Sequence, residues 1–184
     1  MPILCYTLIG DFMYKIKQDE FDIAYAILEE AFPSAELRQY NLMKHFFDKE
    51  EVIFFGIKQN NELAVVLLSW EFDDFAFLEN FAVHKKYRNN GLGSVCLKKV
   101  KEYYKVPIVL EVEKPYDDIS KRRIGFYERN GFILSKYGYN QPPLNKTIND
   151  IPLVMMRYPN ALDETTFVKI KKQIFNRVYQ KEVE

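Results

Sequence analysis

The sequence has few of the residues that build metal centres and disulfide frameworks. Its only cysteines are Cys5 and Cys96, and its only histidines are His45 and His84. Neither pair has the close spacing of a zinc site or a small disulfide framework, and no histidine stands in a spacing that suggests a hydrolase triad. We therefore expect no metal, a core rather than a nucleophilic role for Cys96, and a reducing, cytoplasmic setting.

The sequence also lacks net charge and long apolar runs. Lysine plus arginine and aspartate plus glutamate both number 26, so no overall field attracts the chain to nucleic acid or anionic lipid, and any anion site has to be local. No uncharged apolar stretch approaches the roughly 18 residues of a membrane-spanning helix, and the first residues lack a signal-peptide pattern. We expect neither nucleic acid nor a membrane as a partner.

The chain does contain enough apolar material for one core. Hydrophobic residues make up 48% and aromatic residues 16% of its 184 residues, a composition that favours a folded protein over a disordered one. This length is typical of one ordinary domain. Because no repeat, low-complexity tract or linker divides residues 1–184, we predict a single domain.

Hydrophobic periodicity predicts an α/β fold. Helices are expected at residues 19–32, from a cap at Ser34 to about Phe46, and at residues 92–104, 120–130 and 163–180. Strands are expected at residues 52–57, 63–70, 75–83, 107–113, 132–139 and 151–158. The helix between the third and fourth of these strands makes them parallel neighbours. We therefore expect a mixed, mostly antiparallel sheet of six or seven strands, splayed at the parallel pair, with helices on both faces.

A glycine-containing loop between the strand at 75–83 and the next helix has the chemistry of a phosphate site. Gly91 and Gly93 allow backbone amides to approach an anion closely, and the helix start adds unpaired N–H donors and a favourable dipole. Lys85, Lys86 and Arg88 bring positive charge to the same loop. The alternative is an ordinary loop with solvated lysines, because short glycine patterns often match by chance.

Two other phosphate-binding motifs can be compared with this loop. A P-loop has a lysine directly after its second glycine, whereas Ser94 follows Gly93, which excludes that motif. A dinucleotide fingerprint would use Glu111, 20 residues after Gly91, to bind the ribose. In that fold the glycines follow the strand almost immediately, but here seven residues separate Val83 from Gly91. A dinucleotide-dependent oxidoreductase is therefore the rival hypothesis.

Two motifs in the chain resemble the GNAT family of N-acetyltransferases. The first motif is similar to the family's acetyl-CoA-binding pattern, Arg/Gln-x-x-Gly-x-Gly/Ala after a strand. It consists of Phe81, Ala82, Val83, Arg88, Asn89, Asn90, Gly91, Leu92, Gly93 and Ser94. The second motif, Phe126-Tyr127 followed by Gly131-Phe132, is similar to the family's helix-to-strand segment. Both motifs stand in the family's order and together span about residues 75–135.

The resemblance implies an acyl-CoA N-acyltransferase fold and direct acetyl transfer from acetyl-CoA to an amine, with both substrates bound together. It implies that residues 81–83 form the edge that binds pantetheine and that residues 88–94 hold the pyrophosphate. Tyr127 matches the tyrosine that faces the cofactor sulfur in the family, so the resemblance makes it a general acid or a hydrogen-bond donor to the thiolate. The alternative for Tyr127 is a core aromatic near a helix end.

Two glutamates are candidates for the general base. An ammonium with an ordinary pKa of about 10 has to lose a proton before it attacks a thioester. Strand alternation places Glu79 on the same face as Phe77, Phe81 and Val83. Glu111 lies on the next strand, where some family members that modify protein N-termini carry their base. For either residue the alternative is a solvated or salt-bridged strand glutamate.

Ser120 departs from the family pattern, because many members have a cofactor-binding asparagine at this place. Its hydroxyl either keeps that contact or caps the helix at residues 120–130. Arg122 and Arg123 either approach the cofactor phosphates or face solvent. We expect acetyl-CoA and an unidentified amine acceptor as partners of a monomer or homodimer, with the loop at residues 137–144 on the acceptor side. An acyl-CoA-binding module without turnover is a further alternative.

Overall fold

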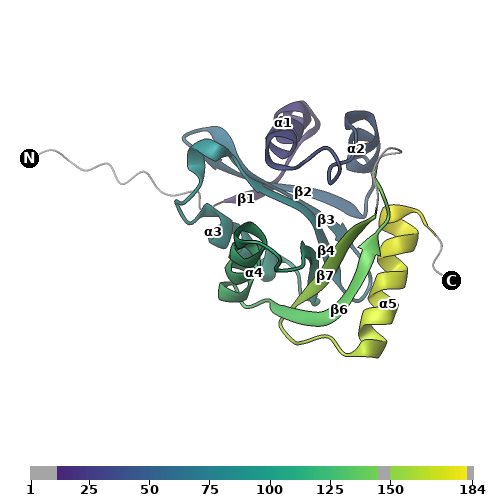
Figure 1. The fold of residues 1–184 in the computed structure, drawn as a ribbon. Coiled ribbons are helices and arrows are strands. Elements are labelled where there is room, and N and C mark those ends of the chain that lie inside the picture. Colours follow the sequence, from purple (N-terminus) through teal and green to yellow (C-terminus); the bar gives the residue numbers. More distant parts are fainter. Residues whose placement is uncertain (1–11, 145–149, 182–184) are drawn as a thin grey trace, which may run out of the picture.

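Seven strands form one mixed sheet in the computed structural model, which describes residues 12–144 and 150–181 (Figure 1). The strands are β1 (Met13–Lys15), β2 (Val52–Gln59), β3 (Glu62–Glu71), β4 (Ala76–Val83), β5 (Ile108–Glu113), β6 (Ile133–Gln141) and β7 (Ile151–Tyr158). Their order across the sheet is β1-β2-β3-β4-β5-β7-β6, and only the β4–β5 pair is parallel. This confirms the predicted mostly antiparallel α/β sheet. The three-residue β1 is too short to produce a periodic signal.

Helices cover both faces of this sheet, as predicted. They are α1 (Phe21–Ala31), α2 (Tyr40–Phe47), α3 (Leu92–Tyr103), α4 (Asp118–Arg129) and α5 (Glu164–Ile174), which continues as a π-helical turn over Phe175–Tyr179. One core cluster joins α1, α2 and α5 to one face, and a second joins α3 and α4 to the other. None of the described helices is long and apolar enough to cross a membrane.

The second helix begins later than predicted. Ser34 does not cap it, because α2 starts at Tyr40, and the residues before it form turns in which the Glu36 amide donates to the Pro33 carbonyl at 2.9 Å. Leu37 lies in this irregular segment and is buried in the core. Leu37 stands at a helical spacing from the apolar residues of α2, but it is apolar because its loop packs on the core.

The parallel strands β4 and β5 separate after three paired residues. Ala76, Phe77 and Leu78 pair with Ile108, Val109 and Leu110, and the pairing ends there. Beyond that point β4 stays paired with β3 and β5 stays paired with β7. The facing backbone edges of β4 and β5 are therefore not hydrogen-bonded to each other, which confirms the predicted splay.

A bulge interrupts β4 next to this splay. Leu68 of β3 pairs with Asn80, but the following residue, Ser69, pairs with Leu78. Glu79 is therefore an extra residue on β4 with no partner across the ladder. An extra residue shifts the alternation of side chains between the two faces of a strand.

The bulge overturns the prediction that Glu79 shares a face with Phe81 and Val83. Phe77 packs in the core cluster of α1, α2 and α5, and Glu79 accepts a hydrogen bond from Trp70 of the same cluster. Phe81 and Val83 pack against the cluster of α3 and α4 instead. The prediction from strand alternation was wrong because every residue around the bulge is compatible with a regular strand. The extra residue therefore cannot be recognised in the sequence.

Candidate active site

A cavity of about 520 Å³ lies at the splay between β4 and β5. Its walls come from β4, β5, the start of α3, α4, the segment after α1 and the C-terminal π-helical turn. Most of the predicted site residues line it, namely Glu79, Phe81, Val83, Arg88, Asn89, Gly91, Leu92, Gly93, Ser94, Glu111 and Tyr127. The predicted residues Ala82, Asn90 and Ser120 are not among the lining residues.

The two glycines shape the end of the cavity at the start of α3. Gly91 stands directly before the helix with φ 77° and ψ −4°, a left-handed conformation that glycine adopts without strain. Gly93 lies in the first turn, where a Cβ atom would come within 3.1 Å of the Phe126 ring. The first N–H groups of a helix have no partner within it. The loop therefore brings free backbone donors close to the cavity without side chains in the way.

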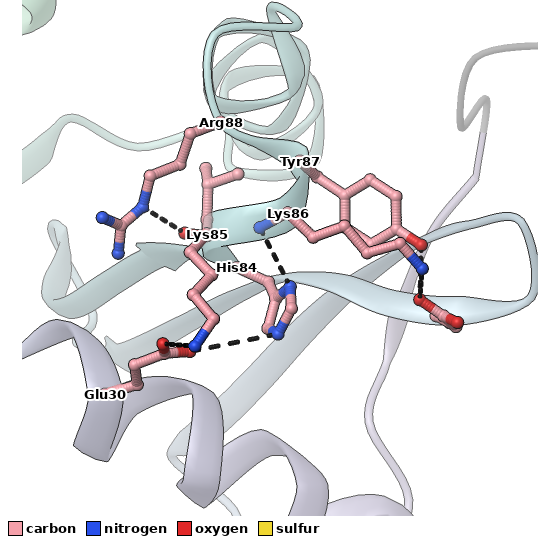
Figure 2. Close-up of polar contacts among 8 residues, drawn as sticks. Glu30, His84, Lys85, Lys86, Tyr87 and Arg88 are labelled. Carbon is pink, nitrogen blue, oxygen red and sulfur yellow. Dashed lines mark hydrogen bonds and ion pairs between the residues drawn. The ribbon is translucent and has the colours of Figure 1, made fainter.

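Only one of the three predicted cationic side chains of this loop lies at the cavity. Figure 2 shows the polar contacts that the three side chains make. The Lys85 Nζ pairs with Glu30 at 2.5 Å, and the Lys86 Nζ pairs with Glu62 at 2.7 Å. Arg88 does line the cavity, and its Nε donates to the last carbonyl of β4 at 3.0 Å. The two lysines are therefore paired with carboxylates of neighbouring elements and do not line the cavity.

Glu79 is held in a buried ion pair. Its Oε2 accepts a hydrogen bond from the Trp70 Nε1 at 2.6 Å, and its Oε1 accepts one from the Arg38 Nε at 2.9 Å. The Arg38 and Glu79 side chains are only 4% and 5% exposed. Arg38 also donates to the Val178 carbonyl at 2.8 Å and thus ties β4 to the C-terminal turn. Both carboxylate oxygens of Glu79 have partners, as in the salt-bridged alternative for this residue.

Glu111 has the environment of a general base. Its Oε2 accepts a hydrogen bond from the Tyr179 hydroxyl at 2.5 Å, while its buried Oε1 has no partner among the described residues. The pKa of Glu111 is raised to about 8, mainly by burial; the Tyr179 hydrogen bond and Arg38 oppose this rise, and the neighbouring Glu79 adds to it. A carboxylate with a pKa near the working pH is well suited to take a proton.

Tyr127 has the environment of a proton donor. It lies on α4, where its ring packs edge-on against Phe126 and Phe132. Burial raises the pKa of Tyr127 to about 12, so its hydroxyl keeps its proton at neutral pH. Its position in the cavity wall is what distinguishes it from a purely structural core aromatic.

Ser120 serves as part of a helix cap. Its backbone N–H donates to the Asp117 Oδ1 at 2.7 Å, and its hydroxyl oxygen accepts from the Asp117 N–H at 3.1 Å. This reciprocal pair starts α4 at Asp118, earlier than predicted. Of the two roles left open for Ser120, the structure favours the helix cap over the cofactor contact.

Three further charged residues line the cavity. Glu36 and Glu113 line it together with Arg123, whose Nη1 pairs with Glu113 at 3.0 Å. Burial raises the pKa of Glu36, as does the neighbouring Glu113. From the predicted acceptor loop at 137–144, Gln141 and Leu144 reach the cavity wall.

Cys96 lies away from the cavity in the core, as predicted. It is fully buried on α3, and burial raises the pKa of its thiol to about 12. A thiol in that environment is not a nucleophile at neutral pH. Within residues 12–144 and 150–181, no group of three or more His, Cys, Asp or Glu side chains is arranged to hold a metal ion.

Comparison with known proteins gives a consistent result. The sequence profile of the acetyltransferase (GNAT) family matches residues 11–132. YjbC of Bacillus subtilis, described as an acetyltransferase, is 28% identical over 160 residues, which cover 84% of this chain and 80% of YjbC. The structure of a GNAT-family acetyltransferase from Bacteroides thetaiotaomicron is 31% identical with a TM-score of 0.84, and the match covers 91% of this chain and 98% of that one.

A more distant relative has been crystallised with its cofactor. A GNAT acetyltransferase from Elizabethkingia anophelis with acetyl-CoA bound shares 19% identity at a TM-score of 0.56, over 79% of this chain and 95% of that one. At this identity the match shows a common fold and no more. Together the comparisons confirm the sequence resemblance and the predicted fold.

Proposed function

Because the chain belongs to the GNAT family of acetyltransferases, we propose that it transfers an acetyl group from acetyl-CoA directly to a primary amine, with both substrates bound together. The observation that carries this proposal is the single cavity, which joins the start of α3 to Glu111 and Tyr127. A proton acceptor and a proton donor thus border the same space as the phosphate-binding backbone. The family profile and the fold both favour an acetyltransferase over the rival dinucleotide-dependent oxidoreductase.

The residues at the start of α3 fit a CoA diphosphate. Gly91 and Gly93 keep side chains away from the first N–H groups of the helix, and Arg88 supplies a cation that is not paired with a carboxylate among the described residues. The edge of β4 beyond Leu78 has no strand partner on the β5 side, so its backbone can pair with pantetheine amides. The acetyl thioester would then lie in the splay.

The two substrates would approach from opposite faces of the sheet. Phe81 and Val83 pack on the face of α3 and α4, together with Tyr127. Glu111 bonds to Tyr179, which belongs to the core cluster on the other face. An acceptor amine beside Glu111 and a thioester beside Tyr127 would therefore meet in the gap between the strands, which supports direct transfer.

Glu111 and Tyr127 take complementary parts in this reaction. Glu111 removes a proton from the ammonium, and the freed nitrogen lone pair forms a bond to the thioester carbonyl carbon. The C–S bond then breaks, and the Tyr127 hydroxyl donates a proton to the departing sulfur. The nitrogen gives up two protons in all: one replaces the proton lost by Tyr127, and the other passes through Glu111 to solvent.

Thermal shifts and thiol release test this function. Acetyl-CoA or CoA at about 100 times its dissociation constant should add roughly 2.7 kcal/mol of stability, and NAD(P)H should add none. Free thiol should then appear only when an amine from a panel of acceptors is present. Stabilisation by CoA without amine-dependent thiol release across the panel would identify a binding module, and stabilisation by NAD(P)H alone would favour an oxidoreductase.

Replacing Tyr127 with phenylalanine should lower kcat about a hundredfold, as expected for the loss of a general acid, without changing CoA affinity. The ring stays in place against Phe132, so only the hydroxyl is lost. Steady-state kinetics and CoA titration measure the two effects. Tyr104→Phe is the matched control, because the buried Tyr104 hydroxyl bonds to Ser69 outside the cavity. Wild-type kcat in the Tyr127 variant would remove its acid role.

The value of kcat/KM should rise with pH as Glu111 loses its proton. Replacing Tyr179 with phenylalanine should move this rising limb of the pH profile to higher pH. The hydrogen bond from Tyr179 lowers the pKa of Glu111, so its loss raises that pKa and the base becomes active only at higher pH. Tyr104→Phe should leave the limb in place. A Tyr179 variant with reduced stability and an unshifted limb would restrict Tyr179 to a packing role.

A further inference from the structure

Two residues that line the cavity each carry a buried side-chain oxygen without a hydrogen-bond partner among the described residues. One is the Oε1 of Glu111, and the other is the Oδ1 of Asn80, a residue that the sequence did not single out. The Asn80 side chain is 3% exposed. Buried polar atoms in folded proteins nearly always have a partner, so an unpaired oxygen in a cavity wall indicates the place of a ligand donor.

Asn80 and Glu111 are on the same face of the sheet. Asn80 pairs with Leu68, which belongs to the core cluster of α1, α2 and α5, and directly paired residues share a face. Glu111 reaches Tyr179 in that cluster. Both residues come just after the last β4–β5 pair, Leu78 with Leu110. The two oxygens thus flank the splay on the face opposite to Phe81 and Val83.

We propose that Asn80 binds the amino group of the acceptor, its Oδ1 accepting one N–H while the Oε1 of Glu111 accepts another. This inference rests on the proposed function and adds a specificity-determining residue to it. A primary ammonium group has three N–H donors, enough for both oxygens, whereas a quaternary ammonium has none. The site therefore selects primary amines over fully substituted cations of equal charge.

The face of the sheet separates this role from a cofactor contact. A pantetheine amide would pair with the backbone edge of β4, whose neighbouring side chains Phe81 and Val83 point to the α3 and α4 side. The Asn80 side chain points away from that side. The arrangement also predicts that the Asn80 oxygen contributes little to stability, because it accepts no hydrogen bond from another described residue.

A titration with two cations of equal charge tests the proposal. The CoA-saturated protein is titrated with n-butylammonium and with butyltrimethylammonium, which has no N–H. The wild type should bind the first and not the second, and Asn80→Leu should weaken n-butylammonium binding roughly tenfold to a hundredfold, the loss of one hydrogen bond to a charged group. The melting temperature of Asn80→Leu should stay the same or rise.

Gln59→Leu is the matched control. It also removes a buried amide oxygen that lacks a partner among the described residues, but Gln59 does not line the cavity. Its affinity for n-butylammonium should equal that of the wild type. Equal binding of the two cations by the wild type, or undiminished n-butylammonium binding in Asn80→Leu, would overturn the proposal.

A measurement on the wild type keeps the proposal testable if Asn80→Leu does not fold. The side-chain amide resonances of Asn80 should shift when n-butylammonium is added to the CoA-saturated protein, whereas a shift with CoA alone and none with the amine would make Asn80 a cofactor contact. Binding through Asn80 without thiol release would keep this inference and remove the proposed transfer. Amine-dependent thiol release with an unchanged acceptor KM in Asn80→Leu would keep the proposed transfer and remove this inference.

Discussion

Replacing Glu111 with glutamine is expected to lower kcat/KM for amine acetylation by about 10²- to 10⁴-fold, the usual contribution of a general base. Glutamine keeps the shape of the side chain and an oxygen that accepts the Tyr179 hydrogen bond, but it cannot take a proton. CoA affinity should not change, because Glu111 lies away from the start of α3. Initial rates and CoA titration measure the two quantities.

Glu79→Gln is the informative comparison for this variant. It leaves Arg38 buried without its counter-charge, and breaking a buried ion pair in this way costs roughly 3–5 kcal/mol. The two glutamates should therefore separate: the Glu111 variant loses activity and keeps its stability, and the Glu79 variant loses stability. The opposite pattern would assign the base to Glu79.

The pH profile gives a second criterion for Glu111. With a pKa of about 8, its carboxylate is protonated at lower pH and ionised above, so kcat/KM should fall as the pH drops through this value. The Glu111→Gln variant should lack this limb. Measuring the profile with two acceptor amines of different pKa distinguishes ionisation of the enzyme from ionisation of the amine. A limb that follows the acceptor, or that persists in Glu111→Gln, would contradict the assignment.

Replacing Gly91 with glutamate is expected to weaken CoA binding by at least about a hundredfold, or roughly 2.7 kcal/mol. The new carboxylate would stand at the start of α3 and repel the phosphates that the helix N–H groups attract. Titration with CoA measures the affinity, and the melting temperature reports on the fold.

Gly91→Ala separates charge from backbone strain. Any Cβ at this φ of 77° costs roughly 1 kcal/mol, although no atom lies within 4 Å of it. The alanine variant should therefore lose some stability and about tenfold or less in CoA affinity. A folded glutamate variant that binds CoA as well as the alanine variant would place the diphosphate elsewhere.

Local sequence patterns were sufficient for strands β2 to β7 and for the glycine-containing loop at the cavity. The order of strand, loop, helix and strand around Gly91 determined the parallel pair, and β-branched residues marked β5 with Glu111 on it. The start of α2 was misplaced because buried loop residues such as Leu37 imitate helical spacing. Apolar spacing records burial, and it does not distinguish a helix from a loop packed on the core.

The environment of the base could not be predicted, because it depends on contacts between distant segments. Arg38 and Glu79 are 41 residues apart, and Glu111 and Tyr179 are 68 residues apart. Neither partner belongs to a recognisable motif. Asn80 was missed for a related reason, because the β4 bulge that turns it toward the face of α1, α2 and α5 cannot be recognised in the sequence.

The C-terminal turn has an evolutionary consequence for an enzyme of this kind. The family profile ends at residue 132, whereas the hydroxyl that tunes Glu111 belongs to Tyr179. Substitutions in this segment can adjust the pKa of Glu111 without disturbing the motif at Gly91. Under the proposed function, selection for a new acceptor can therefore act on the C-terminal segment while the glycine-containing loop stays unchanged.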